Sequence, residues 1–169
     1  MKLKNIKYLA CAAMLGFAMT SCDDFLDRPI EDNYNLDNYY SSDAACVSGV
    51  NYLYNSPWYD FQRGFIKMGE VMSGNMYWGS CPYLNFSVNG TDQDLVNMSY
   101  SLWAVIGHAN TVYNALSGAS ASEATIRQCQ GECLIWKAMA YFYLVRSFGD
   151  VPIIHNTSDV LASGEYKTC

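Results

Sequence analysis

The chain has 169 residues, 51% of them hydrophobic, and a formal net charge of −6. Three of its ten basic residues lie within the first seven positions, whereas all sixteen acidic residues come later, so the part after the leader described below carries a net charge of −9. This acidity argues against nucleic acid as a partner, because phosphate binding depends on Lys and Arg. The length suits one domain with a sizeable core.

The first 21 residues have the organisation of a secretory signal peptide. Residues 1–7 are basic, residues 8–19 are apolar or small, and two small residues precede Cys22. As a helix, the apolar run would be about 18 Å long. This is too short for a hydrocarbon core of roughly 30 Å, so the segment predicts an export signal and not a membrane-spanning helix.

Cys22 stands where a lipoprotein peptidase would cut, and Asp23 and Asp24 follow it. We expect Cys22 to become the lipid-modified first residue of the mature chain. Each buried acyl CH₂ contributes about 0.8 kcal/mol, so several chains together anchor firmly. Residues 22–42, which are polar, acidic and tyrosine-bearing, are expected to form an extended tether. The alternative is an ordinary signal peptide with a chance cysteine.

The next predicted elements are two short helical segments and a loop. Apolar residues recur at helical spacing over 43–55, where Asp43 is the expected N-cap. Pro57 is suited to the first turn of a second segment, 57–73. Residues 74–91 contain Gly, Asn, Ser and Pro that break any period, yet they also hold four aromatic residues, which predicts an irregular, aromatic-rich loop.

Two long helices follow. An apolar stripe with three- and four-residue steps runs from Asp92 to Leu116. A second helix is expected over 122–148, with Ser122 as N-cap and Gly149 as its C-terminal stop. This second helix is apolar on two faces, which predicts that it packs between neighbours on both sides. Two tryptophans, Trp103 on the first long helix and Trp136 on the second, are expected in the core.

The fold class predicted from these elements is all-α. The two long helices, joined by a short polar turn, form an antiparallel αα-hairpin, and the earlier pair forms another. Stacked hairpins are typical of a tetratricopeptide-like architecture, although no clean period repeats in the sequence. We therefore expect one helical domain over 43–169.

Five cysteines remain after Cys22, an odd number without a dense disulfide framework. They are Cys46, Cys81, Cys129, Cys133 and Cys169. Cys129 and Cys133 lie one helical turn apart, which leaves a metal site open, but both histidines are distant in sequence. Small buried thiols are the favoured interpretation. No metal and no cofactor is expected.

Four segments together resemble the SusD/RagB-like nutrient-binding lipoproteins of Bacteroidetes. They are CDDFLD (22–27), GEVMSGNMYWG (69–79), LWAVIGHANTVYNAL (102–116) and GECLIWKAMAYFYLVRSFGDVPII (131–154). The last is the most specific, with its Gly-Glu start and its Gly-Asp-Val-Pro end. The resemblance covers essentially the whole chain.

The resemblance implies a protein without catalytic activity, anchored by lipid in the outer membrane and facing the cell surface. Such proteins cap a TonB-dependent, SusC-like transporter and load it with oligosaccharide or another nutrient. Family members are several times longer than 169 residues, and later residues supply part of their ligand site. We therefore expect the chain to be a truncated N-terminal portion of such a protein.

Sugar recognition needs flat apolar faces for C–H groups and a few placed polar groups for hydroxyls. The loop supplies both, and Trp78 is the first candidate, since by resemblance Tyr77 and Trp78 fall where the starch-binding member carries part of its aromatic arc. The full candidate set is Trp78, Tyr77, Asn75, Tyr83 and Asn85. The alternative for each is packing within its own loop.

Three functions follow from this sequence. The first is a surface lipoprotein that binds glycan and delivers it to the transporter. The second is a non-binding lid or adaptor on the transporter. The third, a secreted glycoside hydrolase, would need two carboxylates at a fixed separation, and nothing in the spacing of the acidic residues favours such a pair.

Overall fold

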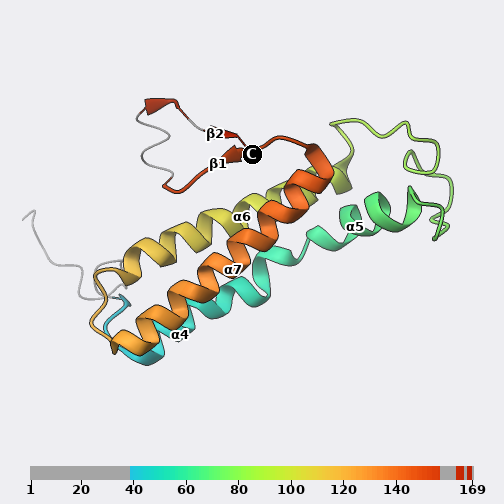
Figure 1. The fold of residues 1–169 in the computed structure, drawn as a ribbon. Helices are drawn as coiled ribbons and strands as arrows, with labels where there is room; N and C mark the ends of the chain where they lie inside the picture. Colours follow the sequence, from blue (N-terminus) through green and yellow to red (C-terminus); the bar gives the residue numbers. More distant parts are fainter. Residues whose placement is uncertain (1–38, 157–162, 166, 169) are drawn as a thin grey trace, which may run out of the picture. The chain divides into compact units, whose positions relative to one another are not determined.

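The computed structural model describes residues 39–156, 163–165 and 167–168. The predicted leader, Cys22 and nearly all of the tether lie outside them. In chain order the elements are α4 (Asp43–Asn51), η1 (Tyr52–Tyr54), η2 (Ser56–Trp58), α5 (Phe61–Ile66), η3 (Lys67–Val71), α6 (Gln93–Leu116), α7 (Glu123–Phe148), β1 (Pro152–Ile153) and β2 (Lys167–Thr168). Within the described residues the strands are two residues each, so the all-α prediction is confirmed (Figure 1).

The N-cap of the first described helix lies one residue earlier than predicted. Ser42, not Asp43, is the N-cap of α4, and its hydroxyl accepts the backbone N–H of Ala45. Asp43 instead directs its carboxylate to Ser122, the N-cap of α7. The predicted cap is therefore wrong for α4, because the Asp43 side chain finds its partners in a distant part of the chain.

The segment predicted as one helix over 57–73 is divided. A 3₁₀ turn and a short α-helix lead into η3, a π-helical turn over Lys67–Val71. At Gly64 the helix α5 passes close to α6: a Cβ placed there would lie 2.6 Å from the backbone oxygen of Asp94. Only a glycine at this position allows the two helices to approach so closely.

The two long helices begin and end close to where they are predicted. Asp92 caps α6 by accepting the N–H groups of Asp94 and Leu95, and Ser122 caps α7 by accepting that of Thr125. Gly149 ends α7 with a φ of 77°, a left-handed backbone that favours glycine. α6 and α7 run side by side as the predicted hairpin (Figure 1).

The core lies between α6, α7 and α4. Its members are fully or almost fully buried, and each aliphatic side chain among them contributes about 1.5–3 kcal/mol on burial. From α6 they are Met98, Leu102, Val105, Ile106, Ala109, Val112 and Leu116; from α7, Cys129, Cys133, Ala140 and Leu144; from α4, Cys46 and Val50. Among the described residues, no helix is long and apolar enough to span a membrane.

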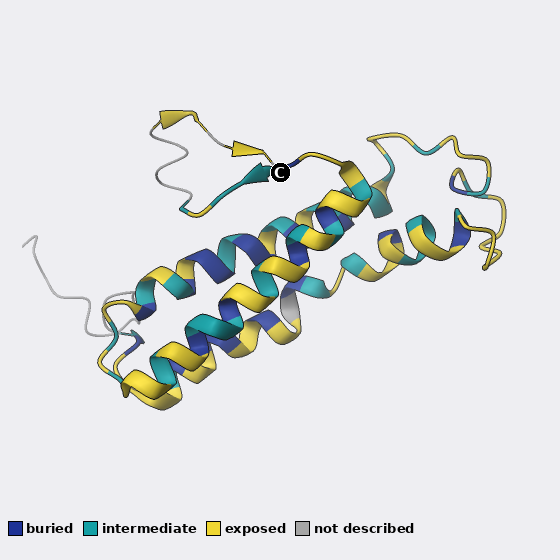
Figure 2. Cartoon of the chain, viewed as in Figure 1, coloured by how far each residue is buried: buried dark blue, intermediate teal, exposed yellow. Residues whose placement is uncertain are grey.

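Helix α7 packs against both α6 and α4, but part of its apolar surface, predicted to be covered, stays exposed. The side that faces away from both, which we call the outer face, carries a row of exposed apolar side chains. The exposed residues of α7 are the yellow segments of that helix in Figure 2. These are Leu134, Ile135, Met139, Phe142, Val145 and Phe148. Ile135 is 64% exposed and Phe142 56%. The sequence pattern predicts this apolar face to be packed, but no described element covers it.

Beyond α7 the chain folds back over the α6–α7 hairpin. The backbone N–H of Ile154 donates to the Tyr141 hydroxyl at 2.7 Å, and the Asn110 amide donates to the Ile154 carbonyl at 2.9 Å. Lys137 donates to the Asn110 side-chain oxygen at 2.7 Å. These bonds fix the position of β1, which pairs antiparallel with β2.

Candidate functional site

The predicted ligand contacts lie in the loop of residues 72–92, between η3 and α6, shown in green in Figure 1. Three of its residues have left-handed backbone: Gly74 at φ 80°, Gly79 at 61° and Phe86 at 53°. Glycine adopts this region readily, whereas a bulky residue does so at a cost. The path of the loop is therefore set by its own backbone as well as by its contacts.

Tyr83 fastens the loop to α6. Its side chain is fully buried, and its hydroxyl donates to the Asp92 carboxylate at 2.6 Å. The same Asp92 oxygen accepts the N–H groups that open α6. Burial, and then the bond to Asp92, raise the pKa of Tyr83. Tyr83 is predicted as a ligand contact, but the structure buries it, so its role is to anchor the loop.

Asp92 keeps its charge despite its position. Burial acts to raise its pKa, but the hydrogen bonds from Tyr83 and Leu95 and the charge of Lys67 outweigh burial, so the pKa of Asp92 is lowered. A charged carboxylate at the start of α6 interacts favourably with the positive end of the helix dipole. The loop anchor and the helix start therefore stabilise each other.

Lys67 lies beneath the aromatic side chains of the loop. Its ammonium group pairs with Asp94, and the two side chains are only 12% and 18% exposed. The same Nζ lies 5.7 Å from the ring centroid of Trp78 and 5.5 Å from that of Tyr83. These distances suit cation–π attraction, which is stronger when the cation is desolvated. Lys67 thereby links both rings to α6.

Trp78 and Tyr77 present aromatic surface to solvent. Trp78 is 39% exposed although its ring also contacts Lys67, and Tyr77 is 79% exposed. A ring supported on one side and exposed on the other is the arrangement that stacking against a flat ligand requires. The two side chains are consecutive in a loop whose path is fixed at both ends.

The two predicted amides are also at the surface. Asn75 donates to the Glu70 carboxylate at 3.2 Å, and the backbone N–H of Met76 donates to the Glu70 carbonyl at 3.0 Å. These bonds tie the start of the loop back to η3. Asn85 is exposed and directly precedes Phe86. The loop thus places polar groups on both sides of Trp78 in sequence.

Comparison with known proteins decides the family. A family model described as "Starch-binding associating with outer membrane" matches residues 24–167. The chain belongs to the SusD-like family. The resemblance stated from the four sequence segments is thereby confirmed.

This SusD-like chain is similar to a SusD-like protein of Bacteroides ovatus, with 33% identity over 159 residues that make up 90% of the chain and 29% of the relative. A solved crystal structure superposes with a TM-score of 0.68 and 30% identity, over 75% of the chain and 26% of the solved one. The matched part of the chain therefore covers less than a third of the length of either.

Lys67 is the residue that sequence reasoning about this SusD-like chain missed. Its partner Asp94 lies 27 positions away, so no local spacing reveals the pair. The π turn that begins at Lys67 has no sequence signature either, beyond the two glycines that weaken a helix prediction at 64 and 69. Trp136, by contrast, packs as expected, against the rings of Tyr54 and Trp58.

Proposed function

We propose that this SusD-like chain is the N-terminal, glycan-contacting part of an outer-membrane lipoprotein that captures oligosaccharide and delivers it to a TonB-dependent, SusC-like transporter. The observation that carries the proposal is the exposed ring of Trp78, supported by Lys67 and followed by an anchor at Tyr83. The family description, which names starch and the outer membrane, supports the same class of ligand.

The chemistry of the loop favours a neutral sugar. An aromatic face packs against the C–H groups of a pyranose, and neighbouring amides exchange hydrogen bonds with its hydroxyls. Trp78 and Tyr77 supply the faces, and Asn75 and Asn85 supply the amides. The cation nearest the rings, Lys67, already pairs with Asp94, so the loop offers little to attract an anionic ligand.

Binding is tested by titrating the full chain, purified in detergent, with maltoheptaose. Trp78→Ala is expected to weaken binding at least about tenfold, a loss of roughly 1.4 kcal/mol. Tyr59→Ala is the matched control, since Tyr59 is also a highly exposed aromatic residue but lies before α5, outside the loop. Equal affinities for wild type and Trp78→Ala would contradict the site assignment.

The proposed membrane attachment rests on residues 1–21 as a leader and on Cys22 as the lipidated residue, followed by Asp23 and Asp24. Cys22→Ser is expected to abolish incorporation of labelled palmitate and to release the protein from the outer-membrane fraction. Unchanged labelling in this variant would show that Cys22 is not the anchor.

A second candidate function is that of a lid or adaptor on the transporter, with little sugar affinity of its own. The outer face of α7 favours it, since contiguous exposed apolar surface is typical of protein contacts. Copurification with the transporter, together with no measurable maltoheptaose binding, would select the adaptor over the glycan binder. Neither candidate involves catalysis, and release of reducing ends by the purified protein would contradict both.

A further inference from the structure

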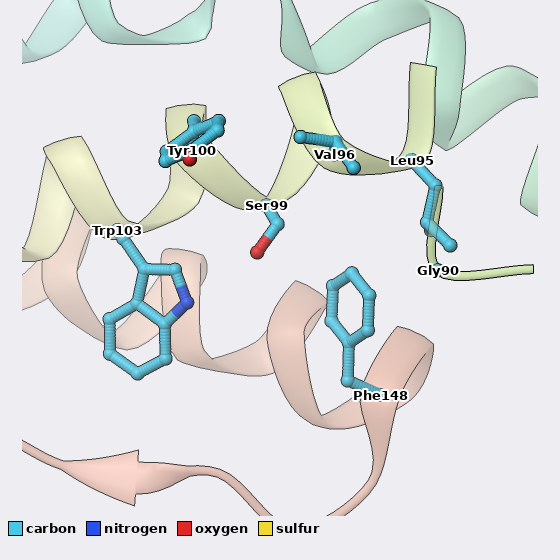
Figure 3. Close-up of a pocket in the computed structure, with 7 residues that line it drawn as sticks. All are labelled: Gly90, Leu95, Val96, Ser99, Tyr100, Trp103 and Phe148. Atoms are coloured by element: carbon cyan, nitrogen blue, oxygen red, sulfur yellow. The ribbon is translucent and has the colours of Figure 1, made fainter. Parts of the chain in front are cut away.

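A second aromatic site lies on α6, on the side that faces the end of α7. It is a cavity of about 330 Å³, which we call the Trp103 pocket. Its walls are Trp103 and Tyr100 on α6 and Phe148 on the last turn of α7, with Ser99 between them and Gly90 of the loop at one edge (Figure 3). Two aliphatic side chains of the first turns of α6 complete the lining.

Trp103 is predicted in the core, and the structure shows a half-buried residue with two different sides. On the inner side its ring makes an edge contact with Tyr141, with centroids 6.2 Å apart. On the other side it faces the pocket. In Figure 3 the indole nitrogen and the Ser99 hydroxyl both point into the space in front of the Phe148 ring.

The lining selects a class of ligand. Among the described residues that line the pocket, no side chain is charged, so an ion would lose its hydration there without a countercharge from them. The aromatic walls provide apolar faces, the indole N–H is a donor, and the Ser99 hydroxyl both donates and accepts. A cavity of this size is at the lower end of the range for small-molecule sites, about 300–1,000 Å³.

We propose that the Trp103 pocket is a second saccharide site, which takes a short neutral sugar segment. The proposal rests on the glycan-binding function above and adds to it a contact outside Trp78. The two sites share one structural element, because Gly90 belongs to the same loop as Trp78 and that loop leads directly into the first turns of α6.

The test uses the four tryptophans of the chain. The full chain, labelled with 5-fluorotryptophan and purified in detergent, gives ¹⁹F resonances that Trp→Phe variants assign. On titration with maltotriose, the Trp103 resonance is expected to shift, and to shift also in Trp78→Ala. The resonances of Trp58 and Trp136, which pack against each other, report whether each variant keeps its fold.

Ser99→Leu fills the pocket. It is expected to weaken the maltotriose affinity reported by the Trp103 resonance at least about tenfold. Ala104→Leu is the matched control, since it adds the same side chain at an exposed α6 position that does not line the pocket. If Ser99→Leu alters the Trp58 and Trp136 signals, Tyr100→Ala replaces it, because Tyr100 is highly exposed and its loss leaves the core intact.

The possible results separate the two proposals. A shift of Trp78 without a shift of Trp103 would overturn the second site and leave the proposed function in place. No shift of either resonance, with maltotriose or maltoheptaose, would overturn both. A Trp103 response that persists unchanged when the pocket is filled would show that the ligand binds elsewhere, and would also refute the second site.

Discussion

The carboxylate of Asp43 accepts two hydrogen bonds from Ser122, one from its backbone nitrogen at 2.7 Å and one from its hydroxyl at 2.9 Å. Asp43 is the first residue of α4 and Ser122 is the N-cap of α7. One negative charge therefore lies at the N-terminal ends of two helices, where it interacts favourably with both dipoles. The bond joins positions 79 residues apart.

This relationship predicts an acid-sensitive contribution to stability. The backbone bond from Ser122, and then the bond from its hydroxyl, hold the pKa of Asp43 below its ordinary 3.8. Because the folded-state pKa is depressed, the contribution is present above pH 3.8 and is lost as the pH falls through the folded-state value. Asp43→Ala is expected to lower Tm at pH 7, with the difference from wild type shrinking as pH falls below 4.

Melting curves between pH 7 and pH 3 check this prediction. Asp60→Ala is the control, because Asp60 precedes α5 without any side-chain capping bond and its loss should leave Tm almost unchanged. A Tm difference for Asp43→Ala that stays constant over the whole pH range would mean that the lost interaction does not depend on charge.

Two glycines predict opposite effects of the same substitution. A methyl group on Gly64 would lie 2.6 Å from the Asp94 backbone oxygen and 2.7 Å from the Met98 Cβ, whereas one on Gly69 would meet nothing within 4 Å. Gly64→Ala is expected to lower the free energy of unfolding by about 1–3 kcal/mol, and Gly69→Ala to raise it by about 0.4–1 kcal/mol. Urea denaturation measures both, and equal effects would show that the α5–α6 approach tolerates a side chain.

The paired cation beneath the loop is expected to matter for both stability and the aromatic surface. Lys67→Met leaves the largely buried Asp94 without its partner, at a cost of about 3 kcal/mol in unfolding free energy. It also removes the cation that supports the Trp78 ring. The Trp78 side chain should then become more accessible, and acrylamide should quench its fluorescence more strongly. Arg63→Met is the control, because Arg63 is exposed and lies 4.0 Å from the same carboxylate, where a pair contributes at most about 1 kcal/mol. A similar loss in both variants would argue against a special role for Lys67.

The buried thiols are expected to be unreactive in the folded protein. Burial, together with the neighbouring Cys129 and Glu132, raises the pKa of Cys133 to about 12, and burial also raises the pKa of Cys129 and of Cys46. The thiolate is the reactive species, so iodoacetamide at pH 8 should modify these three only after unfolding. Cys81, which is half-buried in the loop, should react before these three. Peptide mapping by mass spectrometry distinguishes the sites, and early alkylation of Cys133 would contradict the packing.

The long helices were predictable because their signals are local. Asp92, Ser122 and Gly149 act on backbone groups within a few residues, and the apolar periodicity of α6 corresponds to the side it buries. The loop of residues 74–91 was predictable for the same reason, since its glycines occupy the left-handed positions at 74 and 79.

The features that the sequence did not predict depend on partners far along the chain. Asp43 does not cap its own helix but accepts hydrogen bonds from Ser122, the N-cap of α7, and Lys67 pairs across 27 positions. Tyr83 lies in a loop whose sequence suggests an exposed aromatic residue, and its burial is explained only by the hydrogen bond from its hydroxyl to Asp92. Periodicity alone predicts that α7 has two apolar faces, but not which of them its neighbours cover.

The π turn of η3 bears on how far the loop that follows it can vary in sequence. A π turn is equivalent to one residue inserted into an α-helix, and here it separates the close approach at Gly64 from the loop that starts after Val71. The π turn therefore helps to set the direction in which the chain enters the loop. We expect loop sequences between Met72 and Thr91 that keep the Tyr83 anchor to be exchangeable among relatives while the helical framework keeps its packing.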